Sequence, residues 1–167
     1  MVETAALETA FGRHYPALRE KCRRMLRDSQ EADDVAQETF VRLWNSEMVG
    51  HDPRQVTAWI YKTSTRIAID RLRASANRGR LAPEPEDLAP DLAARLEARV
   101  GLARLVDELP EQELELLLLH RWDGLTHPEI AEVTGRSART VRRLLKRCEE
   151  RLERLSLRLA DAASKEA

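Results

Sequence analysis

The densest set of residues able to do chemistry in this sequence is a basic run, GRSARTVRRLLKR, at positions 135–147. It holds six cations and no carboxylate, in a chain with 28 Lys and Arg against 29 Asp and Glu. Lysine and arginine side chains both bind phosphate oxygens, and arginine also donates paired hydrogen bonds to base edges in the DNA major groove. The run therefore indicates a nucleic-acid surface, with a merely solvated helix face as the alternative.

A helical wheel favours the first interpretation, because it separates the run and its extension into two faces. At ~100° per residue the cations share one side. The opposite side is apolar and collects Ala138, Val141, Leu144, Leu145, Cys148 and Leu152. A solvated helix usually mixes both signs of charge and gains from i,i+4 pairs, whereas acids appear here only from Glu149 onward.

The residues before the run predict the helix that must position it. Thr126 and Glu129 form a T-x-x-E capping box, and Pro128 is tolerated in a first helical turn. Gly135 stands where the chain must leave this helix, which favours a left-handed backbone, and Ser137 is a good N-cap for the next helix. This order is typical of a DNA-binding helix-turn-helix. A preceding helix that begins at Leu109-Pro110 is expected to pack under the pair through Leu114, Leu117 and Leu118.

A second basic segment lies at 54–80, with seven cations and one acid. Within the helix predicted at 56–73, apolar residues line two sides, and Lys62, Arg66 and Arg73 share the remaining stripe, which suits phosphate contact. Trp59 borders this stripe, where it could belong to the core or stack on an unpaired base. The polar loop before the helix, from Asn45 to Gln55, is able to shape a small pocket.

The segment 31–47 predicts an amphipathic helix with an acidic face. Its core side is expected to hold Ala36, Phe40, Leu43 and Trp44. Val35 falls on the other side among acids, which suits docking onto a basic partner. Lone exposed apolar residues are normal, however, so the pattern alone favours an ordinary solvated face.

Composition and the position of the proline-rich segment predict an all-α protein of two small helical domains. Residues 80–92 form a Pro-rich acidic linker between domains at 1–79 and 93–167. Cys22 and Cys148 lack the spacing of a metal or disulfide framework and are expected to pack in cores. No His, Cys or carboxylate cluster has catalytic spacing, so we expect no enzyme activity, metal or cofactor. With no apolar run long enough to span a bilayer, the chain is expected to be cytoplasmic.

Four segments, in this order, resemble the extracytoplasmic-function sigma factors, the two-domain subunits that direct bacterial RNA polymerase to promoters. They are DDVAQETFVRLW, AWIYKTSTRIAIDRLR, the acidic linker and LPEQELELLLLHRWDGLTHPEIAEVTGRSARTVRRLLKRCEERL. The resemblance covers about residues 11–155. It implies a region 2-like helical bundle and a region 4-like helix-turn-helix domain, which together bind core polymerase, recognise −10 and −35 elements and help to melt the −10 region.

The resemblance also implies roles for matching positions. The residues that would dock on the clamp helices of the polymerase's largest subunit are Asp33, Asp34, Val35, Gln37 and Glu38. The candidates for −10 binding are Asn45, Trp59, Lys62, Arg66 and Arg73. The candidates for −35 binding are Arg136, Ser137, Arg139, Thr140, Arg142, Arg143 and Lys146. An anti-sigma factor is a further implied partner.

The sequence departs from the family pattern at two positions. Arg66 replaces the usual Asn before the IAID run, and Leu114 replaces the Arg of an LPxxxR motif, which removes a phosphate contact near −35. The alternative function is a stand-alone helix-turn-helix regulator of the LuxR type, which would bind a palindrome as a dimer. The acidic helix and the second basic segment argue against this alternative.

Overall fold

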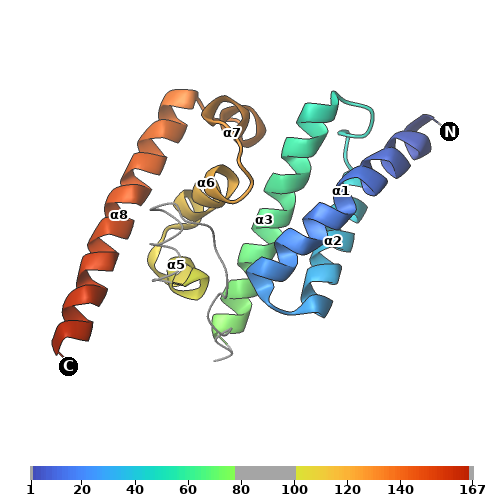
Figure 1. The fold of residues 1–167 in the computed structure, drawn as a ribbon. Helices are drawn as coiled ribbons and strands as arrows, with labels where there is room; N and C mark the ends of the chain where they lie inside the picture. Colours follow the sequence, from blue (N-terminus) through green and yellow to red (C-terminus); the bar gives the residue numbers. More distant parts are fainter. Residues whose placement is uncertain (1, 78–100, 166–167) are drawn as a thin grey trace.

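The computed structural model of the chain describes residues 2–77 and 101–165, and these contain seven helices and no strand (Figure 1). This confirms the all-α prediction. The N-terminal block consists of α1 (Val2–Leu26), α2 (Ser29–Trp44) and α3 (Pro53–Asn77). The C-terminal block consists of α5 (Leu102–Glu108), α6 (Glu111–Arg121), α7 (His127–Thr134) and α8 (Ala138–Lys165). The predicted linker and both domain boundaries lie outside the described residues.

The helices of the N-terminal block enclose a core of their own. The Asp28 carboxylate caps α2, accepting from the backbone N–H groups of Gln30 and Glu31 at 2.8 and 3.0 Å. This N-terminal core collects Leu18, Cys22, Val35, Phe40 and Ile60, among other apolar residues. Burial of such side chains contributes about 1.5–3 kcal/mol each, and it fixes α3 against α1 and α2.

The opposite side of α3 belongs to a second core that both blocks share. Ala68, Ile69 and Leu72 of α3 pack there with apolar side chains of α5, α6 and α8. Figure 1 accordingly shows α3 between α1 and α2 on one side and the C-terminal block on the other. The prediction that α3 packs on two sides is confirmed. Among the described residues the two blocks form one packed unit.

The helix-turn-helix rests on a different part of α6 than predicted. Ile130 of α7 and Val141 of α8 pack on Leu116 and Leu119 of α6. The expected trio of Leu114, Leu117 and Leu118 lies in the shared core, where it packs with Cys148 and Leu152 farther along α8. The physical reason is that every α6 residue from Glu113 to Leu119 is buried, so α6 has apolar neighbours all round. No described helix is both long and apolar enough to cross a bilayer.

Candidate nucleic-acid interface

The helix-turn-helix is built as its residues predict. Thr126 and Glu129 form a complete capping box, in which the Thr126 backbone N–H donates to the Glu129 carboxylate at 2.8 Å. Gly135 ends α7 with φ 67°, in the left-handed region that glycine adopts without steric cost. Ser137 accepts from the Thr140 backbone N–H at 3.1 Å and begins α8. These local bonds fix the angle at which α8 leaves the turn.

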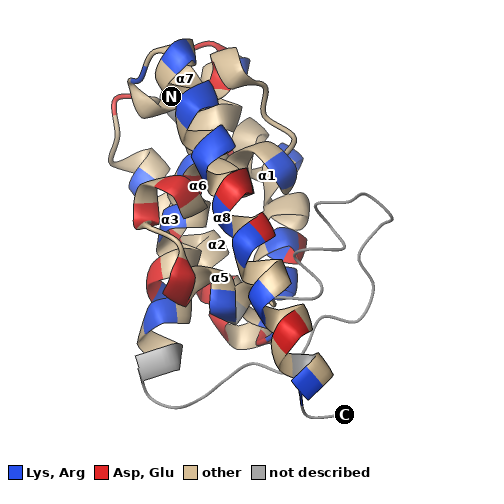
Figure 2. Cartoon of the chain, turned by 90° about the vertical axis from the view of Figure 1, so that its left-hand side faces the viewer, with Lys and Arg blue, Asp and Glu red and all other residues tan. Residues whose placement is uncertain are grey.

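The basic residues at the start of α8 form an open cationic surface. Arg139, Arg142, Arg143 and Lys146 are exposed, and within the described ranges none has an acidic partner. We call these four residues the cationic arc. Figure 2 shows blue residues on α8 near α7, and alternating red and blue toward its C-terminus. Ser137 is also exposed, whereas Arg136 and Thr140 are half-buried at the edge of the arc.

The open surface ends at Arg147, as the change in charge pattern predicts. Arg147 and Arg151 reach the carboxylate of Glu113, at 3.6 and 3.0 Å. That carboxylate is only 3% exposed. From this point α8 serves packing, because Cys148, Leu152 and Leu155 enter the shared core.

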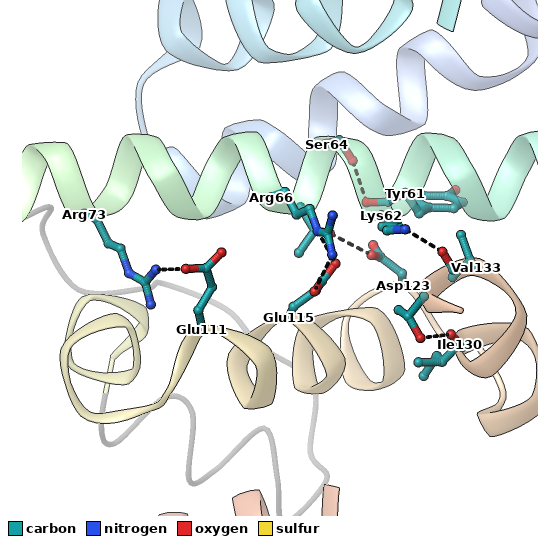
Figure 3. Close-up of polar contacts among 12 residues, drawn as sticks. Tyr61, Lys62, Ser64, Arg66, Arg73, Glu111, Glu115, Asp123, Ile130 and Val133 are labelled. Carbon is teal, nitrogen blue, oxygen red and sulfur yellow. Dashed lines mark hydrogen bonds and ion pairs between the residues drawn. The ribbon is translucent and has the colours of Figure 1, made fainter. Parts of the chain in front are cut away.

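The second predicted DNA surface, the α3 stripe of Lys62, Arg66 and Arg73, lies against the C-terminal block and forms polar contacts with it (Figure 3). Arg66 donates two hydrogen bonds to the Glu115 carboxylate, at 2.5 and 3.1 Å. Arg73 donates to Glu111 at 2.9 Å. Lys62 donates to the Val133 carbonyl at 2.6 Å. The stripe is thus one-sided, as predicted, and its three cations contact α6 and α7, while the Arg66 side chain remains 50% exposed.

A buried ion pair joins the two blocks beside this stripe. The Lys21 ammonium lies 2.7 Å from the Asp123 carboxylate, with side chains 3% and 1% exposed. Lys21 also donates to Thr65 at 2.7 Å and to the Tyr61 carbonyl at 3.2 Å. Loss of hydration lowers the pKa of Lys21 and raises the pKa of Asp123, while each partner's charge opposes the shift on the other.

The two other candidates for −10 binding, Trp59 and Asn45, lie in positions that give less support to a contact with DNA. Trp59 is half-buried against the N-terminal core, which favours packing over base stacking in this arrangement. Asn45 is exposed and caps α2, with its amide donating to the Val41 carbonyl at 3.0 Å. Both positions that depart from the family pattern lie where the blocks meet. Arg66 pairs with Glu115, and Leu114 is fully buried in the shared core.

The acidic face of α2 differs from the prediction at Val35 and at Trp44. Val35 is completely buried, and Trp44, expected in the core, is 56% exposed. Because α1 and α3 both pack against α2, its buried side is wide enough to include Val35, whereas Trp44 falls one position past the last buried residue, Leu43. A second exposed apolar residue of this helix is Val41, at 60% exposure, which sequence reasoning missed.

The acids of α2 divide into paired and open groups. Asp33 forms an ion pair with Arg19, and Glu38 pairs with Arg42 at 2.6 Å. Asp34 and Gln37 are exposed. The i,i+3 and i,i+7 spacing of Asp34, Gln37, Val41 and Trp44 puts them on one side of the helix, and we call these four residues the α2 face. That spacing, applied to exposed positions, was the signal available for finding Val41.

Comparison with known families defines the class of protein. Residues 10–78 match sigma-70 region 2, and residues 99–152 match sigma-70 region 4. The first match covers the described N-terminal block almost completely. The second covers α5 to α7 and the first half of α8. A helix-turn-helix protein that combines both regions is a transcription initiation factor.

Individual relatives narrow the class further. The ferric citrate uptake sigma factor FecI of Escherichia coli is 34% identical over 158 residues, which span 88% of this chain and 90% of FecI. The sigma factor SigW of Bacillus subtilis is 26% identical over 80% of this chain and 79% of SigW. The solved structure of CnrH in complex with the cytosolic domain of CnrY matches with a TM-score of 0.59 at 27% identity, over 91% of this chain and 88% of CnrH.

The chain therefore belongs to the extracytoplasmic-function sigma factors of bacterial RNA polymerase. The stand-alone LuxR-type regulator is not favoured, because the region 2 match accounts for the N-terminal block, which such a regulator does not need.

Proposed function

We propose that this sigma factor binds core RNA polymerase through the α2 face and contacts promoter DNA with separate surfaces on α3 and α8. The observation that carries the proposal is the separation of two open surfaces of different chemistry. The cationic arc is a basic surface, whereas the α2 face combines a carboxylate and an amide with two exposed apolar side chains. In Figure 1, α2 and α8 lie on opposite sides of the molecule, so the two surfaces can be used at the same time.

The α2 face is suited to the clamp helices of the polymerase's largest subunit. An exposed tryptophan beside an aliphatic residue supplies the apolar centre that a docking site needs, and Asp34 and Gln37 supply polar contacts at its edge. Asp33 and Glu38 belong to the edge of this face, where their own ion pairs hold them. Val35 supports the face from beneath, since it is buried in the N-terminal core.

The cationic arc is suited to the major groove of the −35 element, with Arg136, Ser137 and Thr140 at its rim. The proposed −10 surface combines Asn45, Trp59 and the α3 stripe. We further propose that residues 1–79 and 93–167 serve as separate promoter-binding domains joined by the 80–92 linker. The protein is expected to be cytoplasmic, without catalytic activity, and to have an anti-sigma partner; the match to CnrH in complex with CnrY supports that partner.

The test mixes the protein with purified core RNA polymerase and measures co-elution and promoter-dependent transcription. Asp34→Arg and Trp44→Ala are expected to weaken co-elution at least about tenfold, since hot-spot truncations cost about 2 kcal/mol or more. Asp161→Arg is the matched control, because Asp161 is exposed in the last turns of α8 and carries the same charge. If both α2 variants bind core polymerase as well as the control does, the docking assignment is wrong.

A further inference from the structure

Four arginines form a regular row along α8. They stand at every fourth position, as Arg139, Arg143, Arg147 and Arg151. Side chains four residues apart are neighbours on a helix surface, where like charges repel each other. Within the described ranges the first two have no acidic partner, whereas the last two lie near Glu113 of α6. The row is therefore divided into an open half and a half that a carboxylate neutralises.

The Glu113 carboxylate is a buried charge that depends on this row. It lies in the first turn of α6, and its side chain is only 3% exposed. The Arg151 Nε atom lies 3.0 Å from Glu113 Oε2, and the Arg147 Nη2 atom lies 3.6 Å from Oε1. No donor among the described residues is aligned to form a hydrogen bond with Oε2. A buried carboxylate is costly unless cations compensate it, so Glu113 needs both arginines.

Arg147 is the arginine that can move between this carboxylate and DNA. Its separation of 3.6 Å from Glu113 is longer than a hydrogen bond, and its side chain is 53% exposed. It directly follows Lys146, the last residue of the cationic arc, and stands about one turn beyond Arg143. A DNA phosphate can therefore recruit Arg147 only in competition with Glu113, which would lose part of its compensating charge.

We propose that Glu113 is a positioning residue, which withholds Arg147 from DNA and ends the phosphate-contacting surface of α8 at Lys146. This inference rests on the proposed −35 role of the cationic arc. Phosphate contacts carry no sequence information, whereas contacts to base edges do. Withholding one arginine lowers the affinity of α8 for every DNA sequence alike, so base contacts supply a larger share of the affinity that remains.

The first test measures binding of the whole chain to a fluorescein-labelled duplex of scrambled sequence, by anisotropy at several salt concentrations. Glu113→Gln keeps the shape of the side chain and frees Arg147 to reach one more phosphate. The log–log salt slope should therefore steepen by about one, and binding at low salt should tighten several-fold. Glu150→Gln is the matched control, since Glu150 is exposed on α8, has no ion pair among the described residues and changes the net charge equally. Equal slopes for the two variants would overturn the proposal.

The second test asks whether the change at Glu113 acts through Arg147. Arg147→Ala alone should leave the salt slope unchanged, because Glu113 already holds this arginine away from DNA. In Glu113→Gln/Arg147→Ala the slope should return to the wild-type value, whereas a merely structural effect of Glu113→Gln would persist and contradict the proposal. A slope reduced by about one in Arg147→Ala alone would also contradict it, since Arg147 would then already contact a phosphate. This single variant decides the question even if Glu113→Gln does not fold.

Failure of the proposed function would look different. If Arg142→Ala/Arg143→Ala lowers the slope while Glu113→Gln behaves as its control does, the arc binds DNA and only the role of Glu113 is rejected. If Arg142→Ala/Arg143→Ala leaves the slope unchanged while the Glu113 and Arg147 variants behave as expected, the −35 assignment of the arc is rejected and the withholding of Arg147 stands.

Discussion

At the scale of single residues, Lys21 is the most informative side chain of the N-terminal block. A fully buried ammonium is stabilised only when its lost hydration is replaced, and here Asp123, Thr65, Ser64 and a backbone carbonyl supply the replacement. Such pairs add little net stability, because their desolvation offsets most of the attraction. Removal of one partner is much more costly, since the other charge remains buried and unpaired.

This asymmetry predicts the behaviour of two variants. Lys21→Met should lower the free energy of unfolding by about 3–5 kcal/mol, because it leaves Asp123 buried without a counter-charge. Lys21→Met/Asp123→Leu should recover most of that loss. Arg23→Met is the control, since Arg23 is exposed and should cost under about 0.5 kcal/mol. Urea unfolding checks all three, and a double variant no more stable than Lys21→Met would show that the pair is not the cause.

The two cysteines predict a second residue-scale outcome. Burial raises the pKa of the Cys22 thiol to about 11, so its reactive thiolate is scarce at neutral pH. Cys148 is also fully buried. Iodoacetamide should therefore modify neither thiol appreciably in the folded protein at pH 7.5, and both in urea, as read by mass spectrometry. Rapid modification of either thiol without denaturant would mean that its block opens locally.

At the scale of helices, features determined by neighbouring residues could be predicted from the sequence, whereas features determined by tertiary packing could not. The turn between α7 and α8 was predictable because its capping box, its glycine and its Ser137 cap act within a few residues. The burial of Val35 was not predictable in this way, since it depends on α1 and α3 packing on both sides of α2. Leu116 and Leu119 were missed for a related reason, since in a helix buried all round no side is distinguished by polarity.

The cationic arc gives the prediction at this scale. Arg142→Ala/Arg143→Ala should reduce the salt slope for duplex DNA by about two, from roughly four for the whole arc. Stability should hardly change, because both side chains are exposed and unpaired among the described residues. Arg154→Ala, an exposed arginine farther along α8, should leave the slope unchanged. Fluorescence anisotropy at several salt concentrations measures the salt slope of each variant. Equal slopes for all variants would show that the arc does not bind DNA.

At the scale of the whole molecule, the shared core is what the sequence could not disclose. Charge and periodicity identified the α3 stripe and its two apolar sides, yet nothing local said that the second side would meet α5, α6 and α8. Lys21 and Asp123 stand 102 positions apart, so their pairing follows only from the packing of the two blocks. The stripe was thus identified correctly as a cationic surface, but its contacts with α6 and α7 were not predicted.

A shared core predicts cooperative unfolding of both blocks. Trp59 reports on the N-terminal core and Trp122 on the shared core. Trp44→Phe/Trp122→Phe and Trp44→Phe/Trp59→Phe isolate these two reporters in turn. Each variant is titrated with urea and followed by both fluorescence and circular dichroism. In both variants the fluorescence transition should coincide with the loss of helix seen by circular dichroism. A fluorescence transition that does not coincide with the circular-dichroism transition of the same variant would show that the blocks unfold independently.

The continuity of α8 has a consequence for how this protein can evolve. One unbroken helix of 28 residues carries the cationic arc at its start and core residues such as Leu152 and Leu155 further on. The rotational phase between arc and core is therefore set by residue count alone, at ~100° and ~1.5 Å per residue. A single inserted residue between Arg147 and Leu152 would turn the arc by about a quarter circle, whereas four would nearly restore its direction. Insertions or deletions between Arg147 and Leu152 are therefore tolerable only in whole helical turns, because only these keep the cationic arc and the core face in their present relative direction.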